Sequence, residues 1–135
     1  MNKILMIGMA LCFIIAGCTV KEKTISLEQI KDLFEKHEIP LEDPKELHPK
    51  SVFLYTLNGV KPEPFMLDGE LISIYIYSSS NGVLKGMQDF ERQTAGADVA
   101  AHGEYQVANV LIFHGYEGTD ERVEAVIKDM ESLVK

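Results

Sequence analysis

The chain has few cysteines, and both lie near its N-terminus. Cys12 and Cys18 are the only two among 135 residues, so residues 19–135 contain none. This absence excludes a disulfide framework, a cysteine-ligated metal site and thiol catalysis from that part of the chain.

Basic side chains are also scarce. The chain has 13 Lys and Arg against 21 Asp and Glu, and its formal charge is −8. A nucleic-acid-binding domain is expected to carry a basic stripe, so the composition argues against nucleic acid as a partner. The acidity by itself indicates only solubility.

No long hydrophobic run is present. The longest, Ile4–Ile15, has about twelve residues, whereas a membrane-spanning helix needs roughly 20. Lys3 precedes this run, and the small residues Ala16 and Gly17 follow it, directly before Cys18. This order of charge, short apolar core and small residues predicts a secretory signal.

The end of this segment, Ile15-Ala16-Gly17-Cys18, resembles the lipobox of bacterial lipoproteins. The resemblance implies cleavage between Gly17 and Cys18. It also implies an S-diacylglyceryl group on Cys18, with acylation of its amine as an open alternative. The protein would then be held by lipid on the extracytoplasmic face of the cell membrane, with no protein segment in the bilayer.

On this interpretation the chain has three parts. Residues 1–17 are the removed signal, residues 18–25 are the lipidated N-terminus and a short tether, and residues 26–135 form a single globular domain. The seven residues of the tether that follow Cys18 reach roughly 25 Å when extended, so the domain is expected close to the membrane.

Apolar residues at helical spacing predict three helices, over residues 27–38, 82–94 and 120–134. Ser26 and Gln29 form a capping box at the start of the first, and Thr119 is the expected cap of the last. Residues rich in β-branched and aromatic side chains predict strands over 52–57, 60–67, 70–78 and 106–114.

The predicted order is therefore α-β-β-β-α-β-α. Asn58-Gly59 is a hairpin turn signal, and the prolines of the second strand place it at a sheet edge. We expect an α+β fold, namely a two-layer sandwich in which helices cover a small mixed sheet of about four strands.

The histidines offer a candidate metal pair. None of the four stands at a metal-ligand spacing from another His or Cys. His102 lies in the loop before the last predicted strand and His114 ends that strand, so the two are the candidates. Glu104 and Glu117 are the nearby acids. No third ligand is indicated, so neither a metal nor a cofactor is expected.

Two further groups have a structural and a functional interpretation. Ser78-Ser79-Ser80 lies where a strand turns into a helix and is typical of a helix cap. The alternative is an anion site, or a small envelope hydrolase that uses these serines with His102. Tyr75 and Tyr77 share a strand face that is either covered by a helix or lines a ligand groove.

Residues 56–95 (TLNGVKPEPFMLDGELISIYIYSSSNGVLKGMQDFERQTA) and 105–117 (YQVANVLIFHGYE) resemble small lipoproteins of Gram-positive, Bacillus-like bacteria. No activity is assigned to that group, so the resemblance implies location and not chemistry. We expect a membrane-anchored, non-catalytic accessory or binding domain, with an envelope protein as a candidate partner. The alternatives are the hydrolase and a structural or regulatory protein of the envelope or spore.

Overall fold

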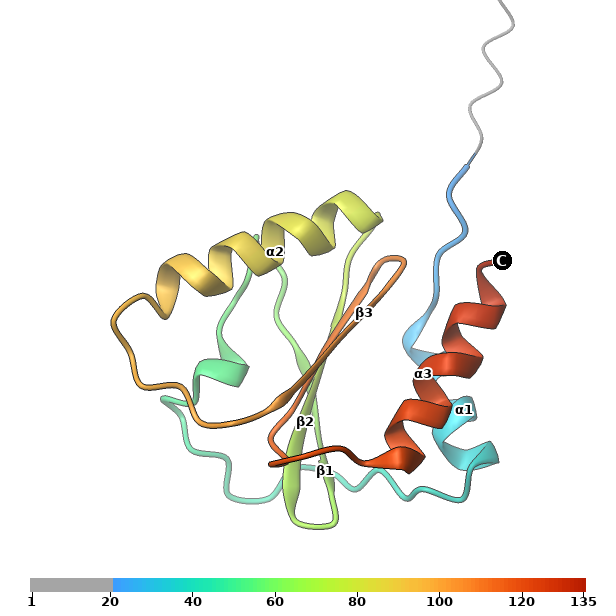
Figure 1. Cartoon of the computed structure of the whole chain (residues 1–135), viewed down its shortest axis with the longest axis horizontal. Helices are drawn as coiled ribbons and strands as arrows, with labels where there is room; N and C mark the ends of the chain where they lie inside the picture. The colour runs from blue at the N-terminus through green and yellow to red at the C-terminus, as the bar shows by residue number, and fades with distance from the viewer. Residues whose placement is uncertain (1–20) are drawn as a thin grey trace, which may run out of the picture.

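The computed structural model describes residues 21–135, so the expected signal and Cys18 lie outside the described residues. It contains the helices and strands of an α+β fold (Figure 1). They are α1 (Leu27–Lys36), the 3-10 helix η1 (Val52–Leu54), β1 (Glu63–Leu67), β2 (Glu70–Ile76), α2 (Ser80–Gln93), β3 (Gly103–Val107), β4 (Val110–His114) and α3 (Glu121–Leu133). The predicted class, with four strands covered by helices, is confirmed.

The four strands form one sheet in the order β1-β2-β4-β3. Every neighbouring pair is antiparallel, so the expectation of a mixed sheet was wrong. The reason is that residues 106–114, predicted as one strand, belong to a hairpin of β3 and β4. The prediction that the proline-containing strand lies at an edge is confirmed, because Pro64 is in β1.

The β3–β4 hairpin turns at Ala108 and Asn109. Ala108 has a φ of 48°, a left-handed conformation that L-residues rarely adopt. The Asn109 side chain is buried and bonded to two neighbouring segments. The residues on either side of the turn are apolar, so the hydrophobic pattern predicted one continuous strand.

The first predicted strand, 52–57, is also absent, since its start forms η1. The Ser51 hydroxyl accepts a hydrogen bond from the Phe53 amide at 3.4 Å, which begins the 3-10 turn. The carbonyls of Phe53 and Tyr55 then accept the Tyr75 hydroxyl at 3.3 and 2.7 Å. The predicted Asn58-Gly59 turn is confirmed, with positive φ at both residues.

The helix boundaries lie within two residues of those predicted. Helix α1 ends at Lys36 and not at residue 38, and α2 begins at Ser80 and not at residue 82. The Ser26–Gln29 capping box of α1 is present. Helix α3 is capped by Asp120 and not by Thr119, because an Asp120 carboxylate oxygen accepts the Arg122 amide at 3.0 Å. A carboxylate at this position also favours the positive end of the helix.

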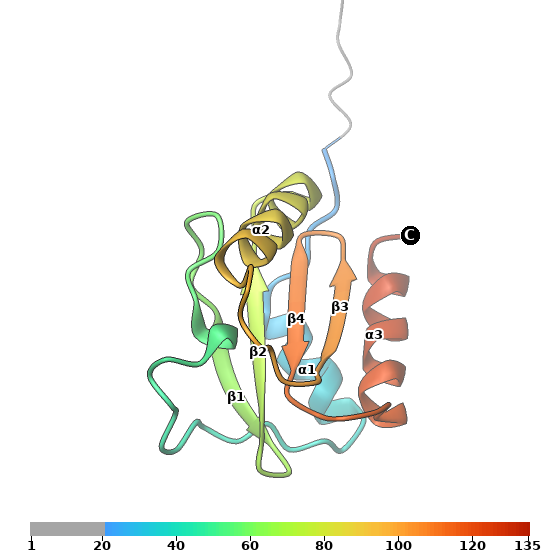
Figure 2. The same cartoon turned by 60° about the vertical axis from the view of Figure 1, so that its left-hand side comes forward.

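Helices cover both faces of the sheet, so the domain has three layers where two were expected (Figure 2). Side chains alternate along each strand. In β2, Ile72 and Ile74 pack into the core beneath α1 and α3, whereas Tyr75 packs into the core beneath α2 and η1. β4 is buried throughout because both of its faces are covered.

The segment before α1 belongs to the domain. Ile25 is 2% exposed and lies in the core beneath α1 and α3. Its amide donates to Asn109 Oδ1 at 2.7 Å, and its carbonyl accepts from Asn109 Nδ2 at 3.0 Å. The domain therefore begins before residue 26, the boundary that the sequence suggested.

Candidate functional site

The predicted histidine pair is not assembled. Phe113 and His114 are neighbours in β4, so their side chains point to opposite faces of the sheet. The His102 ring lies on the α2 face, with its centroid 5.6 Å from that of Phe113 and 4.9 Å from that of Phe53. Within residues 21–135, no cluster of three or more His, Cys, Asp or Glu side chains is arranged to hold a metal ion.

The predicted serine–histidine pair is separated by the length of α2. The Ser79 hydroxyl caps the start of this helix by accepting the Gly82 amide at 3.3 Å, while His102 contacts Phe90 near its end. The ten helical steps from Ser80 to Phe90 span about 15 Å. The Ser78–Ser80 segment therefore acts as a helix cap, and His102 is too distant to serve as its base.

An acidic side chain of the chain itself occupies the expected anion position at the start of α2. The Glu22 carboxylate accepts the Ser80 amide at 3.0 Å. This contact joins the N-terminal segment to α2 and leaves the helix N-terminus with an internal counter-charge.

Tyr75 and Tyr77 do not line a groove, because α2 and η1 cover them. Both rings are buried and stack 6.4 Å apart. The Tyr77 hydroxyl donates to the Leu57 carbonyl at 3.1 Å. Burial, with the nearby Asp89 carboxylate, raises the pKa of Tyr77 to about 12. These tyrosines fasten the 52–60 segment to the sheet.

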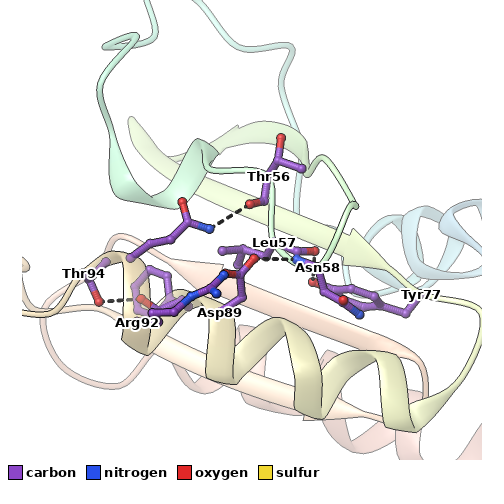
Figure 3. Close-up of polar contacts among 9 residues, drawn as sticks. Thr56, Leu57, Asn58, Tyr77, Asp89, Arg92 and Thr94 are labelled. Atoms are coloured by element: carbon purple, nitrogen blue, oxygen red, sulfur yellow. Dashed lines mark hydrogen bonds and ion pairs between the residues drawn. The ribbon is translucent and has the colours of Figure 1, made fainter.

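The outer side of α2 holds the same segment through a second set of polar contacts (Figure 3). Asp89 accepts the Asn58 amide at 2.8 Å and pairs with Arg92. Gln93 donates to the Thr56 carbonyl at 3.1 Å. The Asn58 amide and the Arg92 side chain hold the pKa of Asp89 below its usual value. These contacts join α2 to the 52–60 segment, so the set is a structural clamp.

A second polar region is a pocket at the end of the sheet that carries the β1–β2 turn. It has a volume of about 440 Å³ and lies where the β1–β2 turn meets the β4–α3 loop and the start of α3. We call it the His114 pocket. Its lining residues are Leu67, Asp68, Glu70, His114, Tyr116, Thr119, Asp120, Glu121 and Arg122.

An ion network forms one wall of the His114 pocket. Arg122 is held by Asp120 at 2.9 Å and by Asp68 at 2.5 Å. These contacts connect the β1–β2 turn to the start of α3. They also hold the pKa of Asp120 below its usual value. The guanidinium charge is therefore already balanced by two carboxylates.

His114 forms the buried part of the pocket. It is 2% exposed, and its ring stacks on that of Tyr116 at 5.5 Å. Neither ring nitrogen has a hydrogen-bond partner among residues 21–135. Burial lowers the pKa of His114, although the nearby Asp120 and Glu70 carboxylates partly oppose the effect. A neutral imidazole with free hydrogen-bonding capacity therefore faces the pocket.

The sequence identified His114 but not its surroundings. No pattern in the sequence linked it to Asp68 in the β1–β2 turn or to Asp120 and Glu121 at the start of α3. They meet because β2 and β4 pair with Ile72 opposite His114, which brings the β1–β2 turn beside the β4–α3 loop. No local spacing encodes that contact.

The state of His114 predicts a loss of stability on acidification. Its pKa is lowered by folding, so the unfolded chain binds the proton first as the pH falls through about 6.5. The stabilising contribution is complete above that pH and is lost below it. Burial of the ring is the main cause of the lowered pKa of His114. The Arg122 charge adds to it, and the charges of Asp120, Glu70 and Asp68 oppose it.

We expect the urea midpoint of the wild-type protein to fall between pH 7.5 and pH 5, and that of His114→Phe to fall less. His48→Gln, at an exposed position, is the matched control and should follow the wild type. An equal decrease for wild type and His114→Phe would show that His114 is not responsible.

No helix within residues 21–135 is long and apolar enough to cross a membrane. No protein-family model, no curated protein and no solved structure matches this chain.

Proposed function

We propose that the protein is a lipoprotein, anchored through Cys18 to the extracytoplasmic face of the cell membrane, whose domain is a non-catalytic binding or accessory module. The signal-like order of residues 1–18 supports the anchor. The observation that carries the proposal is the attachment of residues 22–25 to one end of the domain.

Three contacts make that attachment. Glu22 accepts the Ser80 amide, the Lys23 ammonium donates to the Lys135 carbonyl at 2.8 Å, and Ile25 is bonded to Asn109. The start of the described chain and its C-terminus consequently lie at the same end of the molecule (Figure 1).

This attachment shortens the tether. Only Thr19, Val20 and Lys21 separate Cys18 from Glu22, and four residue steps reach roughly 14 Å at most. An anchored domain would therefore have little freedom to rotate. Its β3–β4 turn and the start of α2 would face the membrane.

The His114 pocket lies at the opposite end of the sheet, because His114 ends β4 whereas Asn109 precedes it. On the proposed anchor, the pocket faces away from the membrane and is accessible to molecules or envelope proteins outside the cell. The separation of Ser78–Ser80 from His102 leaves the hydrolase alternative without an assembled pair. The binding module is the better supported function.

The anchor is tested by Cys18→Ala in the producing cell. We expect the variant to take up no radiolabelled palmitate and to lose membrane retention or remain unprocessed, because the only acceptor thiol after the signal is gone. Thr19→Ala is the matched control and should be labelled like the wild type. Normal labelling and processing of Cys18→Ala would overturn the proposed anchor.

A further inference from the structure

We propose that the His114 pocket binds a small organic ammonium ligand, such as a primary amine. This inference deepens the proposed binding role by naming a site and a ligand class. It does not depend on the lipid anchor.

The first observation is the unpaired imidazole. The His114 side chain makes no hydrogen bond within residues 21–135, and Ser73 Oγ is the one fully buried side-chain N or O atom there that lacks a partner, so the ring nitrogens keep some contact with solvent. The ring is 2% exposed and lines the pocket. Stacking on Tyr116 holds the ring at the wall of the pocket, so a ligand in the pocket contacts it.

The second observation is the charge of the pocket. Its lining includes four acids, Asp68, Glu70, Asp120 and Glu121, and one cation, Arg122, which gives a formal charge of −3 with His114 neutral. Arg122 is already paired with two of these carboxylates. Within residues 21–135, the side-chain carboxylates of Glu70 and Glu121 have no hydrogen-bond or ion-pair partner, so their negative charge remains for a ligand.

These two observations select the ligand class. An anion would be repelled by the unpaired carboxylates. A metal ion lacks a suitable cluster of three ligands among the described residues. An ammonium group can donate to the neutral imidazole and to a carboxylate at the same time, and charge-assisted hydrogen bonds of this kind are the stronger ones. A volume of about 440 Å³ suits a small molecule.

The test uses the full-length protein in a non-ionic detergent and three probes of equal chain length, n-butylamine, n-butanol and butanoate. Amide and histidine NMR signals report binding. We expect n-butylamine to give saturable shifts at residues 68–70 and 114–122, with a Kd on the order of 1 mM for so small a ligand. It should also lower the His114 pKa further, because a bound cation disfavours the imidazolium.

Variants assign the shifts to the pocket. Glu70→Gln should weaken n-butylamine binding about fivefold, and His114→Phe should abolish it. Glu63→Gln, an exposed position on β1, should have no effect. The inference is overturned if n-butylamine gives no saturable shift, if n-butanol or butanoate binds as well, or if Glu70→Gln binds normally. Loss of palmitate labelling in Cys18→Ala is a separate result and does not bear on this one.

Discussion

Asn109→Ala is expected to lower the free energy of unfolding by about 3 kcal/mol. The Asn109 side chain makes three buried hydrogen bonds, one from the Ile25 amide and two to the carbonyls of Ile25 and Tyr77. Alanine leaves these backbone groups without a partner. Each group that gains no water molecule in exchange costs about 1–3 kcal/mol of stability. Domains of this size have a total stability of roughly 5–15 kcal/mol, so the loss is large.

Urea unfolding of the purified protein measures this change. Limited trypsin digestion tests its cause, because the bonds to Ile25 hold the segment that contains Lys21 and Lys23. We expect faster cleavage after Lys23 in Asn109→Ala. The control is Asn81→Ala, an exposed position in the first turn of α2, which should stay within about 0.5 kcal/mol of the wild type. Unchanged stability and cleavage in Asn109→Ala would show that the segment is held by other contacts.

Asn109 also shows what the sequence could and could not predict. Its position was visible as the one polar residue in a run that is otherwise apolar on both faces. A single central strand explained that run as well as a hairpin does, because β4 is covered on both sides and shows no alternation. The distinguishing contact is with Ile25, 84 residues earlier in the chain, and local periodicity carries no information about it.

The elements with local signals were predicted well. Helix α1 has a capping box made by residues three apart, and the Asn58-Gly59 turn needs only the positive φ that these two residues tolerate. The 52–57 segment has strand-forming residues but is held by the Tyr75 and Tyr77 hydroxyls from a distant strand. Tertiary contacts therefore override its local preference.

The candidate site shows the same contrast between local signals and tertiary contacts. His114 was noticed as a residue type, but its partner was sought in His102, which is close in sequence and lies across the sheet. The groups that do surround it come from the β1–β2 turn and the start of α3. Antiparallel pairing of β2 with β4 brings them together, and that pairing could not be read from spacing alone.

Gly86→Ala is expected to destabilise the protein by about 2 kcal/mol. At an ordinary helix position this change would stabilise the helix by about 1 kcal/mol. In α2, a Cβ at Gly86 would meet the Tyr77 hydroxyl and lie 2.7 Å from Tyr77 Cζ. The Tyr77 ring cannot move away freely, because it is buried, stacks on Tyr75 and is bonded to the Leu57 carbonyl. Such overpacking costs about 1–3 kcal/mol. Because the new Cβ overlaps both the hydroxyl and Cζ of Tyr77, we expect the upper value, which leaves a net loss of about 2 kcal/mol after the gain in helix propensity.

A double-mutant cycle separates the clash from other causes. Tyr77→Phe removes the hydroxyl but leaves Cζ, so the cost of Gly86→Ala in that background should fall by about 1 kcal/mol without disappearing. Gln88→Ala, exposed on the same helix, should be close to neutral. Urea midpoints of the single and double variants give the coupling energy. Wild-type stability in Gly86→Ala would contradict the close packing of α2 on Tyr77.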